Sequence, residues 1–283
     1  MEWIERLNNA INYIEENLTE EINFDEISKI ALCSPYHFQR MFAYMADVPL
    51  SEYITRRKMS KAAVDLQDEN NKVMDVSLKY GYDSPTAFNR AFQRMHGIAP
   101  SEVRGSGRSL KAYPPISFQI SIKGVSAMEY RIEKKKEFRI VGVSAPLEKE
   151  IEKNFQVVPA MWGQASQNGT IGKLAAMMDG TITGILGVSS CNEESDWKYF
   201  IAVTSDQPVE KELEEFMVPE ATWAIFTGEG SNLSIQELER RIVTEWLPTS
   251  GYEYGNAPDI EVYISPNPEN AVYEVWIPVV KKS

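Results

Sequence analysis

The chain has 283 residues, 43% of them hydrophobic and 25% charged, with a formal net charge of −12 at pH 7. This length suits two domains of ordinary size, and two cysteines are too few for a disulfide scaffold. Because the chain has no apolar run long enough to cross a membrane and begins with no signal peptide, we expect a cytoplasmic protein without membrane contact.

The N-terminal part is expected to be helical. Apolar residues from Trp3 to Ile14 recur at helical spacing and predict a helix that ends near Asn17. Residues 51–66 show the same periodicity and predict a second helix. A helix of this length is a rigid spacer of about 24 Å, because each residue adds about 1.5 Å.

One stretch of sequence occurs twice, on either side of this spacer. Residues 34–42, Ser-Pro-Tyr-His-Phe-Gln-Arg-Met-Phe, match residues 84–92, Ser-Pro-Thr-Ala-Phe-Asn-Arg-Ala-Phe, at Ser, Pro, both Phe and Arg. Ser followed by Pro begins a helix, because Ser accepts a bond from a free amide and Pro has no amide hydrogen. A shorter amphipathic run precedes each copy, and Gly81 stands at the second bend. The repeat therefore predicts two helix-turn-helix units.

The outward face of each repeated helix carries side chains that can read DNA bases. Asn and Gln can pair with adenine through two hydrogen bonds, and Arg can pair with guanine. These side chains are Tyr36, Gln39 and Arg40 in the first copy, and Thr86, Asn89 and Arg90 in the second. Ordinary surface helices are the alternative interpretation, which the repetition of cap, apolar stripe and Arg disfavours.

Residues 23–104 resemble the AraC/XylS family of bacterial transcription regulators. The second helix-turn-helix carries most of the resemblance, from Gly81 through Phe88 and Phe92 to Gly97 and Pro100. The resemblance implies two helix-turn-helix units joined by a long helix, with promoter DNA and RNA polymerase as partners. It also implies the base-contacting residues, which are Tyr36, Gln39 and Arg40 in the first helix and Pro85, Thr86, Asn89 and Arg90 in the second, although Pro85 offers no polar group.

The distribution of charge fits DNA binding better than its total does. Residues 29–61 carry six basic residues against two acidic ones, and residues 79–108 carry five against two. We therefore expect one basic face on an acidic molecule, with an affinity for DNA that falls steeply with salt.

After a Gly- and Ser-containing joint at residues 105–107, the hydrophobic period changes from helical to alternating. Strands are expected over residues 116–122, 128–132, 138–143, 182–188, 199–203, 222–226, 260–264 and 271–277, with a solvated turn at 133–137 and helices over 148–178 and 234–247. The fold class is thus two domains. Residues 1–107 are all-α, residues 108–115 are a linker, and residues 116–283 are α+β with a curved, mostly antiparallel sheet and two helices.

Aromatic side chains and glutamates alternate in the last strands. Alternation places Glu261 beside Tyr263 on one face, and Glu274 beside Trp276. Aromatic rings around a carboxylate suit an amphipathic cation, which gains both apolar contact and a counter-charge. In the alternative interpretation, the glutamates face solvent and the rings only fill the core.

Residues 116–283 resemble the GyrI-like, Rob-type effector domain, chiefly in residues 223–230, 258–263 and 274–278. The resemblance implies a cleft that binds a lipophilic, often cationic, small molecule, with Glu261 as the usual ligand carboxylate. The candidate ligand-binding residues are Glu261, Glu274, Trp162, Tyr199, Trp223, Tyr254, Tyr263 and Trp276.

The resulting hypothesis is a ligand-responsive transcription regulator with no enzymatic activity, cofactor or metal. A rival is a GyrI-like hydrolase of electrophilic small molecules, in which Glu261 acts with Tyr199 or Tyr263 as an acid/base pair. The two histidines both lie in the DNA-binding half, which argues against a catalytic triad or zinc site in the other half. A protein-docking scaffold is a third possibility. The effector, the operator, the direction of regulation and the oligomeric state stay open.

Overall fold

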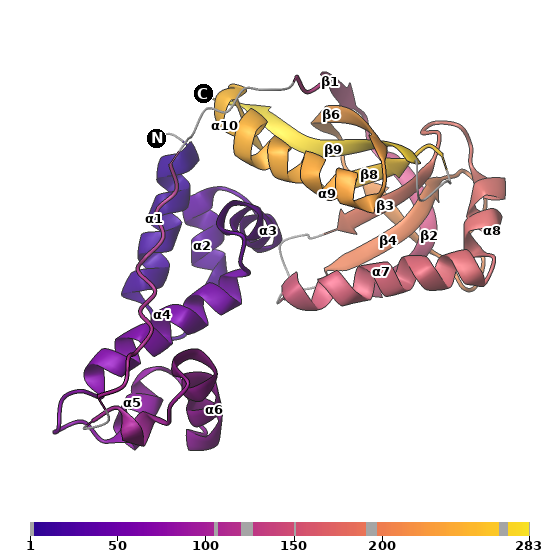
Figure 1. Ribbon diagram of the computed structural model, residues 1–283. Coiled ribbons are helices and arrows are strands. Elements are labelled where there is room, and N and C mark those ends of the chain that lie inside the picture. Colours follow the sequence, from indigo (N-terminus) through magenta and orange to yellow (C-terminus); the bar gives the residue numbers. More distant parts are fainter. Residues whose placement is uncertain are drawn as a thin grey trace. The chain divides into compact units, whose positions relative to one another are not determined.

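The computed structural model describes residues 3–104, 107–119, 127–149, 151–190, 197–265 and 271–282, with the side chains of residues 152, 155 and 232 left out (Figure 1). The chain forms two compact units, one of Met1–Ala31 with Ala46–Gln119 and the other of Leu32–Met45 with Ile120–Ser283. The first repeated helix, α3 (Pro35–Ala46), therefore belongs to the second unit although its neighbours in sequence belong to the first. No helix in the described ranges is long and apolar enough to cross a membrane.

The first unit is helical, as predicted. Its elements are α1 (Trp3–Glu16), α2 (Phe24–Ala31), α4 (Leu50–Asp65), α5 (Val73–Lys79), α6 (Pro85–His96) and the 3₁₀ turn η1 (Pro100–Glu102). The helices α1 and α4 end within one residue of their predicted limits.

The second repeated helix, α6, begins and ends where its sequence predicts. The Ser84 hydroxyl accepts a hydrogen bond from the Ala87 amide at 3.4 Å, and Pro85 occupies the first turn. Gly97 ends the helix in a left-handed conformation with φ 76°. Phe88 and Phe92 are fully buried against the apolar residues of α4 and α5. The cap and the apolar stripe together explain why this segment is a packed helix.

The predicted strand over residues 116–122 is wrong in its first part, because residues 116–119 form no strand. The amide of Phe118 instead donates to the Asn8 side chain at 2.7 Å, and the Asn8 amide donates back to the Phe118 carbonyl at 3.0 Å. A helix side chain thus satisfies the backbone groups that a neighbouring strand would have paired. Residues 120–122 of this prediction, and Gly105 and Ser106 of the predicted joint, lie outside the described residues.

The second unit is built on one antiparallel sheet, which confirms the predicted fold class. Its strands are β1 (Tyr130–Lys135), β2 (Phe138–Pro146), β3 (Ile185–Ser190), β4 (Lys198–Thr204), β5 (Glu214–Val218), β6 (Ala221–Gly230), β7 (Tyr252–Tyr254), β8 (Asp259–Tyr263) and β9 (Ala271–Lys281). The strand order is β1-β6-β9-β8-β3-β4-β2-β5, and β7 pairs with β9. All of these pairings are antiparallel.

The two faces of the sheet have different partners. One face forms an apolar core mainly of strand residues, among them Leu186, Phe200 and Ile260. The other face packs against α7 (Ile151–Gln167), α8 (Thr170–Met177) and α9 (Asn232–Arg241), which Figure 1 shows crossing the strands. We call this second side of the sheet the helical face.

Several predicted limits in the second unit need correction. The turn expected at residues 133–137 is strand as far as Lys135, because β6 pairs with it and an edge strand tolerates charged side chains. The helix expected over 148–178 is divided into α7 and α8 at Gly169, whose φ is 84°. The helix expected over 234–247 continues from α9 as a π-helical turn, η2 (Ile242–Trp246), and a short α10 (Leu247–Thr249).

Two strands were missed, β5 and β7. Strand β5 lies at the end of the sheet and begins with two exposed glutamates, so its sequence shows no clear alternation. Strand β7 has only three residues. Periodicity cannot detect a strand that is so short or so polar.

Candidate ligand site and reading helices

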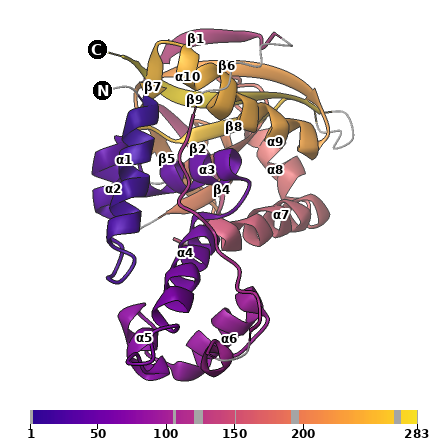
Figure 2. The same cartoon turned by 60° about the vertical axis from the view of Figure 1, so that its left-hand side comes forward.

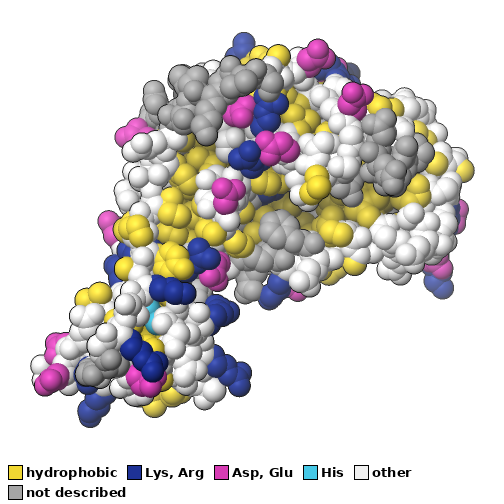
Figure 3. Space-filling model, in the orientation of Figure 1, with side chains coloured by type: hydrophobic (Ala, Val, Ile, Leu, Met, Phe, Trp, Pro, Cys, Tyr) yellow, Lys and Arg dark blue, Asp and Glu magenta, His cyan; other side chains and the backbone are white. Residues whose placement is uncertain are grey.

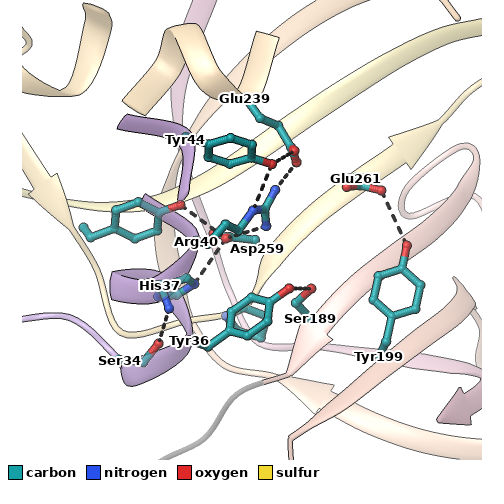
Figure 4. A network of polar contacts seen from close by, with 12 residues as sticks. Ser34, Tyr36, His37, Arg40, Tyr44, Ser189, Tyr199, Glu239, Asp259 and Glu261 are labelled. Atoms are coloured by element: carbon teal, nitrogen blue, oxygen red, sulfur yellow. Dashed lines mark hydrogen bonds and ion pairs between the residues drawn. The ribbon is translucent and has the colours of Figure 1, made fainter. Parts of the chain in front are cut away.

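Three carboxylates gather on the helical face, and we call them the acidic cluster: Glu239 from α9, and Asp259 and Glu261 from β8 (Figure 4). Asp259 and Glu261 are two residues apart on one strand, so the pleat directs both to the same side. The Glu239 and Asp259 side chains are each only 5% exposed. Buried carboxylates need a positive charge or hydrogen-bond donors nearby.

Arg40 of α3 supplies that positive charge. Its guanidinium donates one hydrogen bond to Asp259 at 3.1 Å and another to Glu239, which also accepts a 2.5 Å bond from the Tyr44 hydroxyl. The Arg40 side chain is 12% exposed. Burial would lower the pKa of Arg40, but Glu239, Tyr44 and Asp259 outweigh it and raise that pKa well above its ordinary value. Arg40 therefore stays charged in this site.

Asp259 is held by three groups. The Nε2 atom of His37 lies 3.2 Å from Asp259 Oδ2, and the Tyr254 hydroxyl donates to the same oxygen at 3.2 Å. Burial would raise the pKa of Asp259, but His37, Arg40 and Tyr254 together lower it. Its other oxygen, Oδ1, is buried and accepts no hydrogen bond from the described residues.

Glu261 has an aromatic surrounding. The Tyr263 hydroxyl donates to Glu261 Oε2 at 2.8 Å, and the Tyr199 hydroxyl lies 3.5 Å from the same atom. Trp162 of α7 donates to Tyr199 at 2.9 Å, and its ring meets the Tyr263 ring edge-on at 4.8 Å. Trp162, Glu261 and Tyr263 are partly exposed, so solvent reaches this part of the cluster.

The pKa of Glu261 is raised to about 8. Burial is the largest cause, and the neighbouring carboxylate of Glu239 adds to it, whereas Arg40 acts in the opposite direction. Near neutral pH, Glu261 therefore holds a proton that a nearby cation would displace.

Gly187 makes the room that Glu261 needs. A Cβ atom at this position of β3 would lie 2.3 Å from the Tyr199 hydroxyl and 3.1 Å from Glu261 Oε2. Any other residue would push these two side chains apart.

Three of the eight ligand candidates, Glu274, Trp223 and Trp276, lie on the opposite face of the sheet from the acidic cluster. In the register of β8 and β9, Glu261 stands opposite Val275 and Glu274 stands opposite Val262, so the two glutamates lie on opposite faces. Glu274 accepts bonds at 2.8 Å from Arg131 and from Trp276. Trp223 and Trp276 are buried in the strand-built core. Of the eight candidates, five therefore lie on the helical face near the acidic cluster: Glu261, Trp162, Tyr199, Tyr254 and Tyr263.

The base-contacting candidates of α3 all contact other parts of the second unit. The Tyr36 hydroxyl lies 3.3 Å from the Ser189 hydroxyl, and the Tyr36 ring meets Trp197 edge-on at 5.6 Å. The Gln39 amide donates to the carbonyl of Lys149 at 2.9 Å. Together with Arg40, these residues place the outward face of α3 against the helical face of the sheet.

The corresponding face of α6 lies at the surface. Pro85, Thr86 and Arg90 are exposed, and Asn89 is half-buried. Figure 3 shows Lys and Arg side chains on the lobe that contains α5 and α6, with some acidic side chains among them. Lys79 of α5 and Arg94 of α6 have exposed side chains.

Sequence reasoning missed Asp259, Glu239, His37, Tyr44 and Gly187. Asp259 could have been found, because it precedes Glu261 by two positions in the same strand. Glu239, His37 and Gly187 gave no signal, since a glutamate on a polar helix, a histidine beside an apolar stripe and a glycine in a strand each have ordinary explanations.

Comparison with known proteins matches each half of the chain to a protein family. Residues 128–280 match the family of GyrI-like small molecule binding domains, and residues 27–106 match a helix-turn-helix domain family. A 92-residue stretch, 32% of this chain and 68% of the relative, is 40% identical to the HTH-type transcriptional activator AarP of Providencia stuartii. A 98-residue stretch, 35% of this chain and 92% of the relative, is 31% identical to the regulatory protein SoxS of Escherichia coli strain K12.

Among solved structures, SAV2435 bound to tetraphenylphosphonium aligns with 54% of this chain and 94% of that chain, at 21% identity and a TM-score of 0.48. The sequence matches cover both halves in the predicted order. The chain belongs to the AraC-type DNA-binding transcription regulators, and its C-terminal half belongs to the GyrI-like small-molecule-binding domains.

Proposed function

We propose that the chain reads promoter DNA with α3 and α6, and alters transcription by RNA polymerase when an amphipathic cation binds at the acidic cluster. The contacts of Arg40 are the single observation that favours a cationic ligand most. A guanidinium already bonds Glu239 and Asp259 at this place, so the site accepts a buried positive charge.

The aromatic side chains near Glu261 supply the apolar part of the site. The rings of Trp162 and Tyr263 contact each other and are partly exposed, and Tyr199 lies beneath them with its hydroxyl toward Glu261. A ligand with an aromatic ring and a positive charge would stack on these rings while its charge faced the carboxylates.

Two small probes test the charge requirement: phenylguanidinium, and its neutral isostere phenylurea. Glu261→Gln should weaken binding of phenylguanidinium by about tenfold, because one charged hydrogen-bond acceptor is lost, and should leave phenylurea unchanged. Glu274→Gln is the matched control, since Glu274 lies on the other face. Calorimetry measures the affinity of each probe for the unchanged chain and for both variants. An equal loss for both probes would contradict a charge-based site.

The raised pKa of Glu261 predicts a pH dependence. Phenylguanidinium favours the ionised carboxyl, so its affinity should increase as pH rises toward about 8 and then level off. The dependence should disappear in Glu261→Gln. Calorimetric titrations between pH 6 and 9 measure it, and an affinity that falls with rising pH would show that Glu261 does not face the cation.

A hydrolase is the second candidate, and one observation favours it. The Tyr263 hydroxyl and Glu261 Oε2 are 2.8 Å apart, so the two groups are hydrogen-bonded. A carboxyl and a phenol held together in this way can act as an acid/base pair on a bound substrate. Incubating the full chain with an epoxide such as styrene oxide tests this. Turnover that Glu261→Gln abolishes would establish the enzyme, and no turnover above buffer would exclude it for this substrate class.

A further inference from the structure

By sequence, α3 is the reading helix of the first helix-turn-helix, yet its outward face is occupied. Tyr36 is 7% exposed and Gln39 is 3% exposed. Arg40 forms ion pairs with two carboxylates. Side chains must reach base edges in the major groove to read sequence, so these residues cannot do so in this arrangement.

We propose that α3 is an internal ligand of the acidic cluster: the guanidinium of Arg40 occupies the place of an effector's cationic group, so that effector binding and release of α3 for DNA are coupled. This inference rests on the proposed function and adds the regulation of that same site. An effector competes with α3 rather than binding beside it.

The buried charges explain why release needs an effector. If Arg40 left alone, Glu239 and Asp259 would remain deep in the protein without a cation, which is strongly unfavourable. A cationic effector removes this penalty by taking the place of the guanidinium. DNA, which binds only the released α3, and the effector then strengthen each other's binding.

The geometry also defines the class of cation. Arg40 donates N–H bonds to two separate carboxylates, and Asp259 Oδ1 is a buried acceptor with no partner among the described side chains and amides. A quaternary ammonium or phosphonium ion has no N–H group and would leave these oxygens unsatisfied. A guanidinium or amidinium attached to an aromatic ring satisfies them.

The sequence of α3 fits this role and that of α6 does not. The residues of α3 that contact the rest of the second unit at positions 36, 37 and 44 are Tyr, His and Tyr, whereas positions 86, 87 and 94 of the second copy are Thr, Ala and Arg. Tyr36 packs on Trp197, the His37 ring lies tilted against the Tyr254 ring with centroids 4.5 Å apart, and Tyr44 donates to Glu239. Of the two copies, only α3 therefore carries aromatic side chains at these three positions.

A labelling experiment with the full chain tests the proposal without DNA. The chain has two histidines, His37 and His96, which are 4% and 5% exposed. Diethyl pyrocarbonate modifies accessible imidazoles, and mass spectrometry reports each site. Saturating phenylguanidinium should accelerate modification of His37 by about tenfold and leave His96 unchanged. Trimethylphenylammonium, which has no N–H donor, should act much more weakly.

Variants of the residues that contact α3 separate the attachment of α3 to the sheet from its reading of DNA, because they leave the sequence of α3 unchanged. Glu239→Gln removes an Arg40 partner and should expose His37 without any probe, whereas Glu237→Gln, on the same helix but paired with Arg240, should not. Ser189→Ala removes one hydrogen-bond partner of Tyr36 but no carboxylate, so it should expose His37 and still bind phenylguanidinium.

The outcomes distinguish the two proposals. If phenylguanidinium binds by calorimetry while the His37 rate stays constant, the internal-ligand proposal is overturned and the proposed function stands. If none of the probes binds, both are overturned. A His37 rate that does not change in Glu239→Gln or in Ser189→Ala would also overturn the internal ligand.

Discussion

The helices α3 and α6 carry nearly the same sequence but have different surroundings. Both begin with Ser-Pro and bury two Phe side chains, Phe38 and Phe42 in α3, and Phe88 and Phe92 in α6. Their outward faces differ: that of α6 is exposed, whereas that of α3 contacts the sheet of the second unit, and Figure 2 labels both helices. The repeat thus determines the apolar face of each helix, and a few unmatched residues determine what its polar face contacts.

The apolar faces should respond alike to truncation. Phe42→Ala and Phe92→Ala each remove a buried aromatic ring and should each lower the free energy of unfolding by about 3–5 kcal/mol. Urea unfolding followed by circular dichroism measures this. Thr86→Ala, at an exposed position, is the control and should change stability little. A small effect at only one of the Phe positions would break the equivalence of the two copies.

The polar faces should respond differently. Without effector, Arg90→Ala should weaken binding to a selected DNA duplex by about 10- to 100-fold, the range expected for one lost guanine contact. Arg40→Ala should reduce the affinity for DNA much less, because Arg40 is bonded to Glu239 and Asp259 and does not contact DNA in this state. With phenylguanidinium bound, Arg40→Ala and Arg90→Ala should reduce the affinity for DNA by similar factors. Electrophoretic mobility shifts measure them, and equal losses without effector would contradict the asymmetry.

The turns before the repeated helices also differ. Leu32 has φ 53° and is 59% exposed, whereas Gly81 has φ 78° at the turn of the second helix-turn-helix. A left-handed conformation strains any residue except glycine, so Leu32→Gly should raise stability by about 1 kcal/mol and Gly81→Ala should lower it by about the same amount. Thermal unfolding checks both signs. A destabilised Leu32→Gly would mean that the Leu side chain has a packing role.

Much of the fold could be predicted from the sequence because its signals are local. The cap of α6, the alternation of β8 and β9, and the spacer helix α4 each depend on a few neighbouring residues. The acidic cluster was only partly predictable. Glu261 and Tyr263 share a strand, but Glu239 and Arg40 come from distant segments that only the tertiary fold brings together.

The placement of α3 could not be predicted for the same reason. Its Arg matches that of α6, and the sequence alone predicts the same role for both. The separation of Glu261 from Glu274 was equally hidden, because alternation fixes the face within each strand but not the register between two strands.

The most direct test of the account is the affinity of the full chain for one DNA duplex, selected from a random pool in the presence of phenylguanidinium, measured with and without that cation. Coupling through α3 predicts that saturating phenylguanidinium lowers the Kd for DNA by about tenfold or more, and that DNA lowers the Kd for the cation by the same factor. An unchanged or higher Kd for DNA, with the cation demonstrably bound, would contradict it.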